Sequence, residues 1–198
     1  IIKSPPAYDL SHWVEVPNFA NVFPVPTLVI TKATEGTFYT DDKFVRYFNG
    51  IALIGARRGC YHFHRKTYDA TAQAHYFINA IRPHITDKDI LILDVEEGGE
   101  TAAQLKQWFD TVRDAFPNNP LMIYSRKNIL DPIVMTAAQK EYFKRIPVWT
   151  AGYPSFPDLW NTPTGYIPDQ TKWGKVLLWQ YSDKGTVKGI QGSVDLNW

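Results

Sequence analysis

The stretch 90-ILILDVEEGG-99 decides how the rest of the sequence is interpreted. Four aliphatic residues lead directly into three carboxylates, of which Asp94 and Glu96 are separated by a single valine. An unbroken apolar run of this kind is typical of a strand covered by helices on both faces of a parallel sheet. We therefore expect a buried strand over residues 89–96 that carries carboxylates at its carboxyl end.

Short apolar runs and amphipathic stretches alternate along the chain around this strand. Further strands are expected at residues 7–11, 27–33, 60–64, 121–125, 147–151, 175–182 and 193–198. Helices are expected at residues 40–49 with a stop at Gly50, at 70–81 with Asp69 as the cap, from a Thr101–Gln104 capping box to Phe116, and, less regularly, at 128–143. Pro154, Pro157, Pro163 and Pro168 exclude a long helix after the strand at 147–151.

This order indicates an α/β fold with a largely parallel sheet, because parallel neighbours need a crossover connection. Eight strands with only about five helices fit an incomplete, irregular TIM-like barrel better than a doubly wound open sheet. The length of 198 residues fits one domain, and we expect a single barrel domain over residues 1–198.

Composition excludes several classes of function. A net charge of +1 gives no strong field toward nucleic acid or an anionic membrane, and no segment reaches the roughly 20 apolar residues of a membrane span. The single Cys60 excludes an internal disulfide and a cysteine-based zinc site. His62 and His64 have the spacing of a strand metal pair, with His12 as a third candidate, but core or cleft hydrogen bonding is the better interpretation. We expect no metal and no cofactor.

The spacing of Asp94 and Glu96 suits glycoside hydrolysis. Alternate residues of a strand share a face, so these side chains point the same way with Cα atoms about 7 Å apart. One carboxyl group can remain protonated as the general acid, since each raises the other's affinity for protons, while the other stabilises positive charge at the sugar. An isolated Asp-x-Glu before two glycines also fits a solvated loop.

Other strand ends favour the catalytic interpretation. Asp9, Glu35 and Asp195 end three further strands, and aromatic or amide side chains end others, namely Tyr124, Trp149, Trp179 and Gln180. If the strands form one barrel, these side chains converge on one opening, with acids at the bottom and aromatic rings at the rim. Aromatic rings stack on the apolar faces of sugars, so this opening would suit a carbohydrate.

Seven motifs in order then carry a family resemblance: YDLSHW (8–13), KATEG (32–36), YHF (61–63), LDVE (93–96), WTAGY (149–153), LWQYS (178–182) and GSVDLNW (192–198). Together they resemble glycoside hydrolase family 25, the Chalaropsis-type lysozymes, over essentially the whole chain. The resemblance implies a (β/α)5(β)3 barrel. It also implies N-acetylmuramidase activity, which cuts the β-1,4 bond between N-acetylmuramic acid and N-acetylglucosamine in peptidoglycan.

The resemblance also implies roles for individual residues. Glu96 corresponds to the proton donor, Asp94 to its partner near the substrate's N-acetyl group, and Asp9 and Asp195 to the other two acids. Substrate-binding positions are expected at Glu35, Tyr61, Tyr124, Trp149, Tyr153, Trp179 and Gln180. We favour a route in which the 2-acetamido oxygen attacks the anomeric carbon, with an inverting route through a water activated by Asp9 or Asp195 as the alternative.

Two other functions stay open at this point. One is a glycan-binding module that has lost turnover, although four carboxylates held together against their repulsion favour an enzyme. The other is a chitinase. The expected partner is bacterial peptidoglycan, without nucleic acid or membrane insertion, and the expected state is a monomer. The expected location is extracellular, by secretion or as a phage-released endolysin, although no signal peptide is visible at Ile1–Pro6.

Overall fold

The strand predicted from the opening stretch, β5 (Ile90–Val95), lies in a closed and mostly parallel sheet. The computed structural model describes residues 7–15, 17–153 and 170–198. The other strands are β1 (Ala7–Leu10), β2 (Leu28–Glu35), β3 (Tyr39–Thr40), β4 (Arg57–Phe63), β6 (Leu121–Ser125), β7 (Val148–Ala151), β8 (Val176–Gly185) and β9 (Val194–Asn197).

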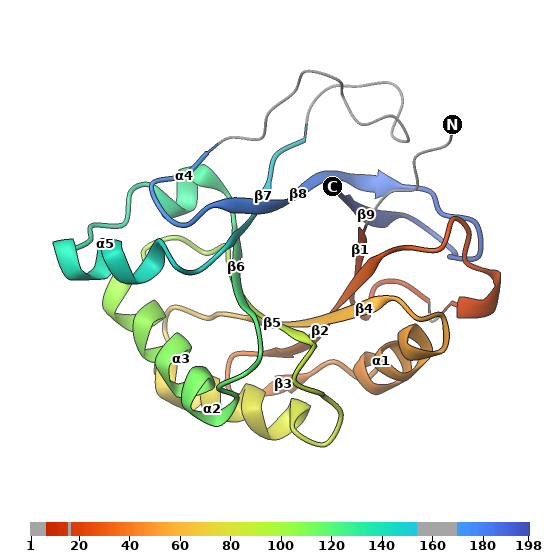
Figure 1. Ribbon diagram of the computed structural model, residues 1–198, viewed down its shortest axis with the longest axis horizontal. Coiled ribbons are helices and arrows are strands. Elements are labelled where there is room, and N and C mark those ends of the chain that lie inside the picture. Colours follow the sequence, from red (N-terminus) through yellow and green to blue (C-terminus); the bar gives the residue numbers. More distant parts are fainter. Residues whose placement is uncertain (1–6, 16, 154–169) are drawn as a thin grey trace.

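The sheet order is β1-β9-β8-β7-β6-β5-β4-β2-β3, and an additional pairing of β1 with β2 closes the ring (Figure 1). Strand β9 runs antiparallel to both of its neighbours, and β3 forms a two-residue hairpin on β2. All other pairings are parallel. The irregular TIM-like barrel expected from the sequence is therefore confirmed, apart from the short β3, which the sequence pattern did not indicate.

Alternation along β5 separates an outer from an inner layer. Leu91, Leu93 and Val95 belong to a cluster that also contains the buried faces of the helices, whereas Ile90 and Ile92 pack inside the barrel. The strand is buried on both sides because helices cover its outer face and the opposite strands cover its inner face. Position 94 continues the inner series, which directs Asp94 into the barrel.

The helices lie outside the ring, in the connections between strands (Figure 1). They are α1 (Phe44–Leu53), α2 (Ala70–Ile81), α3 (Ala102–Ala115), α4 (Lys127–Leu130) and α5 (Ala137–Phe143), with a 3-10 turn η1 (Phe19–Asn21) between β1 and β2. Two predicted caps are confirmed. Asp69 accepts a hydrogen bond from the Ala72 amide at 2.8 Å, and Thr101 forms the reciprocal capping box with Gln104. These caps set the starts of α2 and α3.

Two helix predictions were wrong in their bounds. Helix α1 continues through Gly50 instead of ending there, because the glycine allows a close approach: a Cβ at Gly50 would lie 2.3 Å from the Phe19 ring. The irregular helix expected at 128–143 is two helices. Pro132 has no amide N–H with which to continue the hydrogen-bond ladder of α4, and Thr136 then caps α5 through the backbone amide of Gln139.

Strand β8 is longer than predicted and runs to Gly185. Its last part forms a hairpin ladder with β9, in which Ser182 stands opposite Leu196 and Gly185 opposite Val194. The four prolines at 154, 157, 163 and 168 lie outside the described residues. Within the described part of the chain, no helix combines the length and apolar character that a bilayer span requires.

The capping box of α3 gives a test of the fold. We expect Thr101→Ala to lower the free energy of unfolding by about 1 kcal/mol, because it removes the side-chain acceptor for the Gln104 amide. Thr101→Ser keeps that acceptor and serves as the matched control. Urea unfolding followed by circular dichroism measures both, and equal stability of the alanine and serine variants would contradict the role assigned to the cap.

Candidate active site

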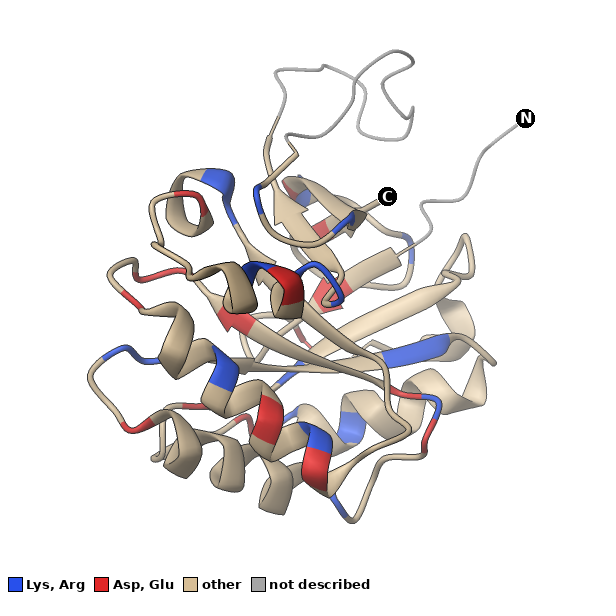
Figure 2. Cartoon of the chain, turned by 60° about the vertical axis from the view of Figure 1, so that its left-hand side comes forward, with Lys and Arg blue, Asp and Glu red and all other residues tan. Residues whose placement is uncertain are grey.

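The barrel brings acids from three strands to one end. Asp9 lies on β1, Asp94 on β5 and Asp195 on β9, while Glu96 follows directly after β5. Figure 2 shows acidic positions on the strands of the barrel as well as on its outer helices. Asp9 shares the inner side of β1 with the interior residue Ala7, just as Asp94 continues the inner series of β5. Sequence reasoning expected these acids at a common opening, and their role there stays a prediction.

Asp9 and Asp195 form a coupled pair. They stand opposite each other in the β1–β9 pairing. The Gln180 amide nitrogen donates to Asp9 Oδ2 at 3.0 Å and to Asp195 Oδ2 at 3.2 Å, and Asn197 Nδ2 donates to Asp9 Oδ2 at 2.7 Å. Asp9 thus receives two amide donors on one oxygen, which stabilise its charged form.

The side-chain amides of Asn197 and Gln180 are oriented by aromatic residues that donate hydrogen bonds to the amide oxygens. Trp149 Nε1 donates to Asn197 Oδ1 at 2.6 Å, which leaves the Asn197 NH₂ group facing Asp9. The hydroxyls of Tyr124 and Tyr153 donate to Gln180 Oε1 at 2.8 Å and 2.7 Å. Because the aromatic donors occupy the amide oxygens, the amide nitrogens of Asn197 and Gln180 point toward the acids.

Burial and hydrogen bonding act differently on the two members of the Asp9–Asp195 pair. Burial raises the pKa of Asp9 above its ordinary value, and hydrogen bonds from Asn197, Gln180 and Asp195 offset part of that rise. Burial also raises the pKa of Asp195, and the negative charge of Asp9 and the hydrogen bond between the two carboxyls raise it further. These opposing effects favour a proton on Asp195 and a negative charge on Asp9.

Asp94 and Glu96 form the second pair. Burial raises the pKa of Asp94 well above its ordinary value, and the charge of Glu96 adds to that rise. Burial also raises the pKa of Glu96, with Asp9 adding to the rise and Arg126 opposing it. Asp94 is 5% exposed, and its Oδ1 has no hydrogen-bond partner among the described residues. This pair therefore holds a proton to higher pH than ordinary carboxyl groups do, and it retains a buried acceptor without a partner among the described residues.

A network of ion pairs supports the loops around these acids. Lys32, a buried cation on the inner side of β2, pairs with Glu35, and Arg65 pairs with both Glu35 and Glu97. The Glu97 carboxylate also accepts from the Lys66 amide at 2.9 Å. The loops that follow β2, β4 and β5 are thereby tied together, which fixes the segment that carries Glu96. Glu35 lies in this network beside the acids.

The predicted aromatic positions divide into two groups. Tyr61, Tyr124 and Trp149 lie with the interior cluster, and the rings of Tyr124 and Trp149 are 4.3 Å apart. Trp179 does not join them. It packs with Tyr181 in the cluster outside β8 and donates from Nε1 to the Gly152 carbonyl, because alternation along β8 turns Gln180 inward and its neighbours outward.

Two of the three candidate histidines, His62 and His12, have polar partners, whereas the ring nitrogens of the buried His64 have none among the described residues. His62 lies outside the barrel between helices, where Nδ1 is 2.7 Å from Thr34 Oγ1 and Nε2 is 3.2 Å from Gln73 Oε1. Burial lowers the pKa of His62 to about 3, so it stays neutral. His12 pairs with Asp41 instead, at 3.4 Å. Among the described residues, no cluster of three or more His, Cys, Asp or Glu is placed to hold a metal ion.

Sequence reasoning missed four residues around the acids: Lys32, Arg65, Arg126 and Asn197. Parity would have indicated two of them, because Asn197 lies two positions after Asp195 and Arg126 lies two positions after Tyr124. The role of Arg65 depends on how the loops after β2, β4 and β5 meet, and no local pattern carries that information.

Comparison with known proteins places the chain in a family. The family model for glycosyl hydrolases family 25 matches residues 8–190. The chain belongs to this family. The family suggested by the seven ordered motifs is thereby confirmed. Asp9, Asp94 and Glu96 fall inside the matched residues, and Asp195 lies beyond them.

Individual relatives agree with this assignment. The chain is 30% identical over 204 residues to lysozyme M1 of Streptomyces globisporus, covering 96% of this chain and 65% of that protein, which is just under two thirds of its length. It is also 30% identical over 206 residues to the N,O-diacetylmuramidase of Chalaropsis sp., covering 95% of this chain and 94% of that protein. The solved structure of a bacterial lysozyme from Streptomyces coelicolor is similar with a TM-score of 0.74 and 25% identity, covering 97% of this chain and 90% of that one.

The Arg65 network gives a pH-dependent prediction. Burial alone would raise the pKa of Glu35 and of Glu97. Hydrogen bonds from Lys32 and Arg65 outweigh burial at Glu35, and hydrogen bonds from Arg65 and the Lys66 amide outweigh it at Glu97. Both pKa values therefore lie below the ordinary 4.5. A depressed folded-state pKa stabilises the fold above the unfolded value and ceases to do so as pH falls through the folded value.

We expect Arg65→Gln to lower the free energy of unfolding by about 1 kcal/mol at pH 7, since the Arg65 side chain is partly exposed and its pairs are screened. The difference from wild type should shrink below pH 4.5, the ordinary pKa of glutamate. Urea unfolding at pH 7 and pH 3.5 measures it, with Arg65→Lys as the charge-conserving control. A difference that stays constant with pH would contradict the ion-pair account.

Proposed function

We propose that the chain is a lysozyme of the N-acetylmuramidase type, which hydrolyses the β-1,4 bond between N-acetylmuramic acid and N-acetylglucosamine in bacterial peptidoglycan. The observation that carries this proposal is the meeting of Asp9, Asp94, Glu96 and Asp195 at one end of a closed barrel. The names of the two relatives above, a lysozyme and a muramidase, support the same substrate.

Glu96 is the general acid in this proposal. Its pKa is raised, chiefly by burial, so a proton is available above the pH at which an ordinary glutamate is ionised. Glu96 is also less buried than Asp94, and it lies at the end of the strand rather than within it. It is therefore the member of the pair that an incoming glycosidic oxygen reaches first.

Asp94 then has a different role. Its buried, unpartnered Oδ1 is suited to accept the N–H of the substrate's 2-acetamido group. That hydrogen bond favours the charged form of Asp94 and leaves the shared proton on Glu96. Asp94 thereby turns the acetamido oxygen toward the anomeric carbon, where it attacks as Glu96 protonates the leaving oxygen.

The state of the Asp9–Asp195 pair supports this substrate-assisted route over inversion. Asp195 holds a proton, and Asp9 Oδ2 is occupied by two amide donors. Neither group is then a strong base for activating water in the first step. An ionised Asp9 close to the reaction centre instead stabilises the positive charge that develops on the sugar ring.

The rim supplies rings for sugar binding. Tyr153 is 41% exposed above Gln180, and Tyr61, Tyr124 and Trp149 lie deeper. Trp13, in the loop after β1, is 85% exposed, an unusual position for a tryptophan. Flat rings at this end of the barrel suit the apolar faces of a glycan strand.

The biological setting follows as part of the same proposal. A muramidase acts on the cell wall from outside the cell or as a phage-released endolysin, with peptidoglycan as its partner. We propose a single catalytic domain that works as a monomer and needs no nucleic acid, cofactor or membrane insertion.

The first test is Glu96→Gln. We expect the rate of peptidoglycan clearing to fall by a factor of about 10² to 10⁴, because the amide has no proton to give to the leaving oxygen. Glu141→Gln is the matched control and should retain most activity, since Glu141 is exposed on α5 and pairs with Lys144. Equal clearing by wild type and Glu96→Gln would remove Glu96 from the mechanism, and no clearing by wild type would favour a glycan-binding module.

The second test distinguishes the two routes and the type of bond cut. We expect NMR of the first product formed to show a retained anomeric configuration, and mass spectrometry to show muramic acid at the new reducing end. A thiazoline analogue of N-acetylmuramic acid should inhibit competitively, because it mimics the cyclised acetamido group. An inverted first product would select water activation, and glucosamine at the reducing end would indicate a glucosaminidase.

A further inference from the structure

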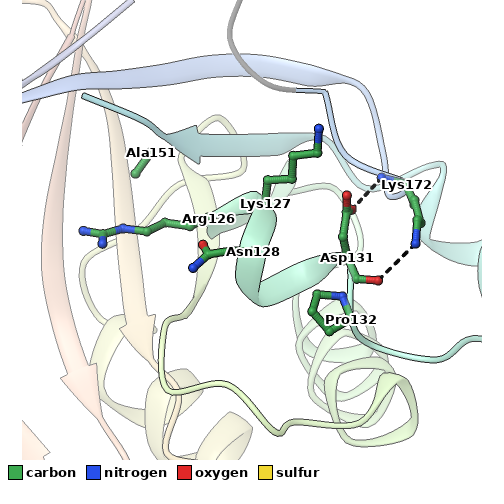
Figure 3. A pocket seen from close by; sticks show the side chains of 7 residues that line it. All are labelled: Arg126, Lys127, Asn128, Asp131, Pro132, Ala151 and Lys172. Atoms are coloured by element: carbon green, nitrogen blue, oxygen red, sulfur yellow. Dashed lines mark hydrogen bonds between the residues drawn. The ribbon is translucent and has the colours of Figure 1, made fainter. Parts of the chain in front are cut away.

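A basic cavity of about 720 Å³ lies beyond the carboxyl ends of β6 and β7, where Arg126 follows β6 and Ala151 ends β7 (Figure 3). Its lining consists of Arg126, Lys127, Asn128, Asp131, Pro132, Ala151 and Lys172. Three of these side chains are cations and one is a carboxylate. The cavity is thus a positively charged recess.

Among the described residues, the cations that line the cavity outnumber its carboxylates, since Asp131 stands against Arg126, Lys127 and Lys172. No ion pair among the described residues involves Arg126, Lys127 or Lys172. Asp131 accepts the backbone amide of Lys172 at 3.0 Å, and the Lys172 ammonium donates at 3.4 Å to the Asp131 backbone carbonyl rather than to its carboxylate (Figure 3). The two lysine side chains therefore keep charge available for a ligand.

Arg126 connects this cavity to the acids. It follows directly after β6, its charge lowers the pKa of Glu96, and its guanidinium lies 5.6 Å from the centre of the Tyr153 ring. Figure 3 shows its side chain extending to the opposite side of the cavity from Asp131 and Lys172. A glycan bound with its scissile bond at Glu96 therefore passes beside the cavity.

We propose that this cavity binds the acidic peptide stem of peptidoglycan, an inference that rests on the proposed muramidase function. The muramic acid next to the scissile bond carries a lactyl group, to which the stem peptide is joined, and stem peptides bear free carboxylates. Lys127 and Lys172 bind those carboxylates, and the Asn128 side-chain amide is placed for a peptide group. A bare lactyl carboxylate offers the same chemistry from a second source, closer to the sugar.

The double variant Lys127→Gln/Lys172→Gln tests this assignment. Both residues are exposed, so the fold does not depend on them, and neither belongs to the acid cluster. The control is Lys88→Gln/Lys140→Gln, which makes the same charge change at two exposed lysines away from the cavity, one before β5 and one on α5. Two substrates are compared: glycan strands with intact stems, and strands stripped by an amidase so that only the lactyl carboxylate remains.

We expect the double variant to lower kcat/KM on stem-bearing strands about five-fold, mainly through KM, while stripped strands change less than two-fold. The selective loss should diminish at high salt, because exposed charge pairs are screened. The control variant should match wild type on both substrates.

Three outcomes would overturn the inference. The first is an unchanged kcat/KM of the double variant on stem-bearing strands. The second is an equal loss on both substrates, which would assign the lysines to the lactyl carboxylate. The third is an equal loss in the control variant, which would indicate a general charge effect. Failure of the proposed function looks different, because wild type would then release reducing ends from neither substrate.

Discussion

The candidate site depends on β1 pairing with two strands at once. Its parallel partner β2 follows it in the chain, and its antiparallel partner β9 lies at the other end of the described sequence. Only this double pairing converts a twisted sheet into a closed ring, and it brings Asp9 opposite Asp195. An open sheet that lacked the β1–β9 pairing would leave Asp9 and Asp195 on separate edges and Asp94 on a central strand. The contacts that close the barrel are therefore also the contacts that assemble the acids.

Closing the ring brings four carboxyl groups together in a buried space, and the surrounding side chains determine which of them carry charge. Four carboxyl groups in a buried space cannot all be ionised, so burial and mutual repulsion raise their proton affinity. Amide donors then select Asp9 as a charged member of the set, since Gln180 and Asn197 donate to it while their own orientations are set by tyrosine and tryptophan partners. The result is a site whose acids differ in charge because their hydrogen bonds differ.

Much of this arrangement was accessible from sequence because it repeats simple periodicities. The apolar run before Asp94 predicted a doubly covered strand, and alternation predicted that Asp94 and Glu96 share a face. Caps at Asp69 and Thr101 gave the starts of α2 and α3. The failures have tertiary causes. Gly50 resembles a helix stop until the Phe19 ring is seen against it, and Trp179 resembles a cleft residue until the inward position in β8 is known to belong to Gln180. Arg65 could not be placed at all, because its partners come from loops 30 and 32 residues away.

The cations around the mouth differ in how strongly they affect the acids, according to the partners that each cation has. Lys32 is buried beside Glu35, and it lowers the pKa of Asp94 and Glu96 only as a secondary influence after burial. Arg65 forms ion pairs with Glu35 and Glu97, which lie outside the acid cluster, so its charge mainly stabilises the loops. Arg126 lowers the pKa of Glu96 and has no ion-pair partner among the described residues, so of these three cations it is the one most available to bind an anionic ligand. A cation in direct contact with Glu96 would ionise the acid, whereas one at the rim can attract an anionic glycan and still leave the proton in place. In the proposed function, the separation of charge between the interior and the rim would allow one opening both to attract an anionic glycan and to protonate its glycosidic oxygen.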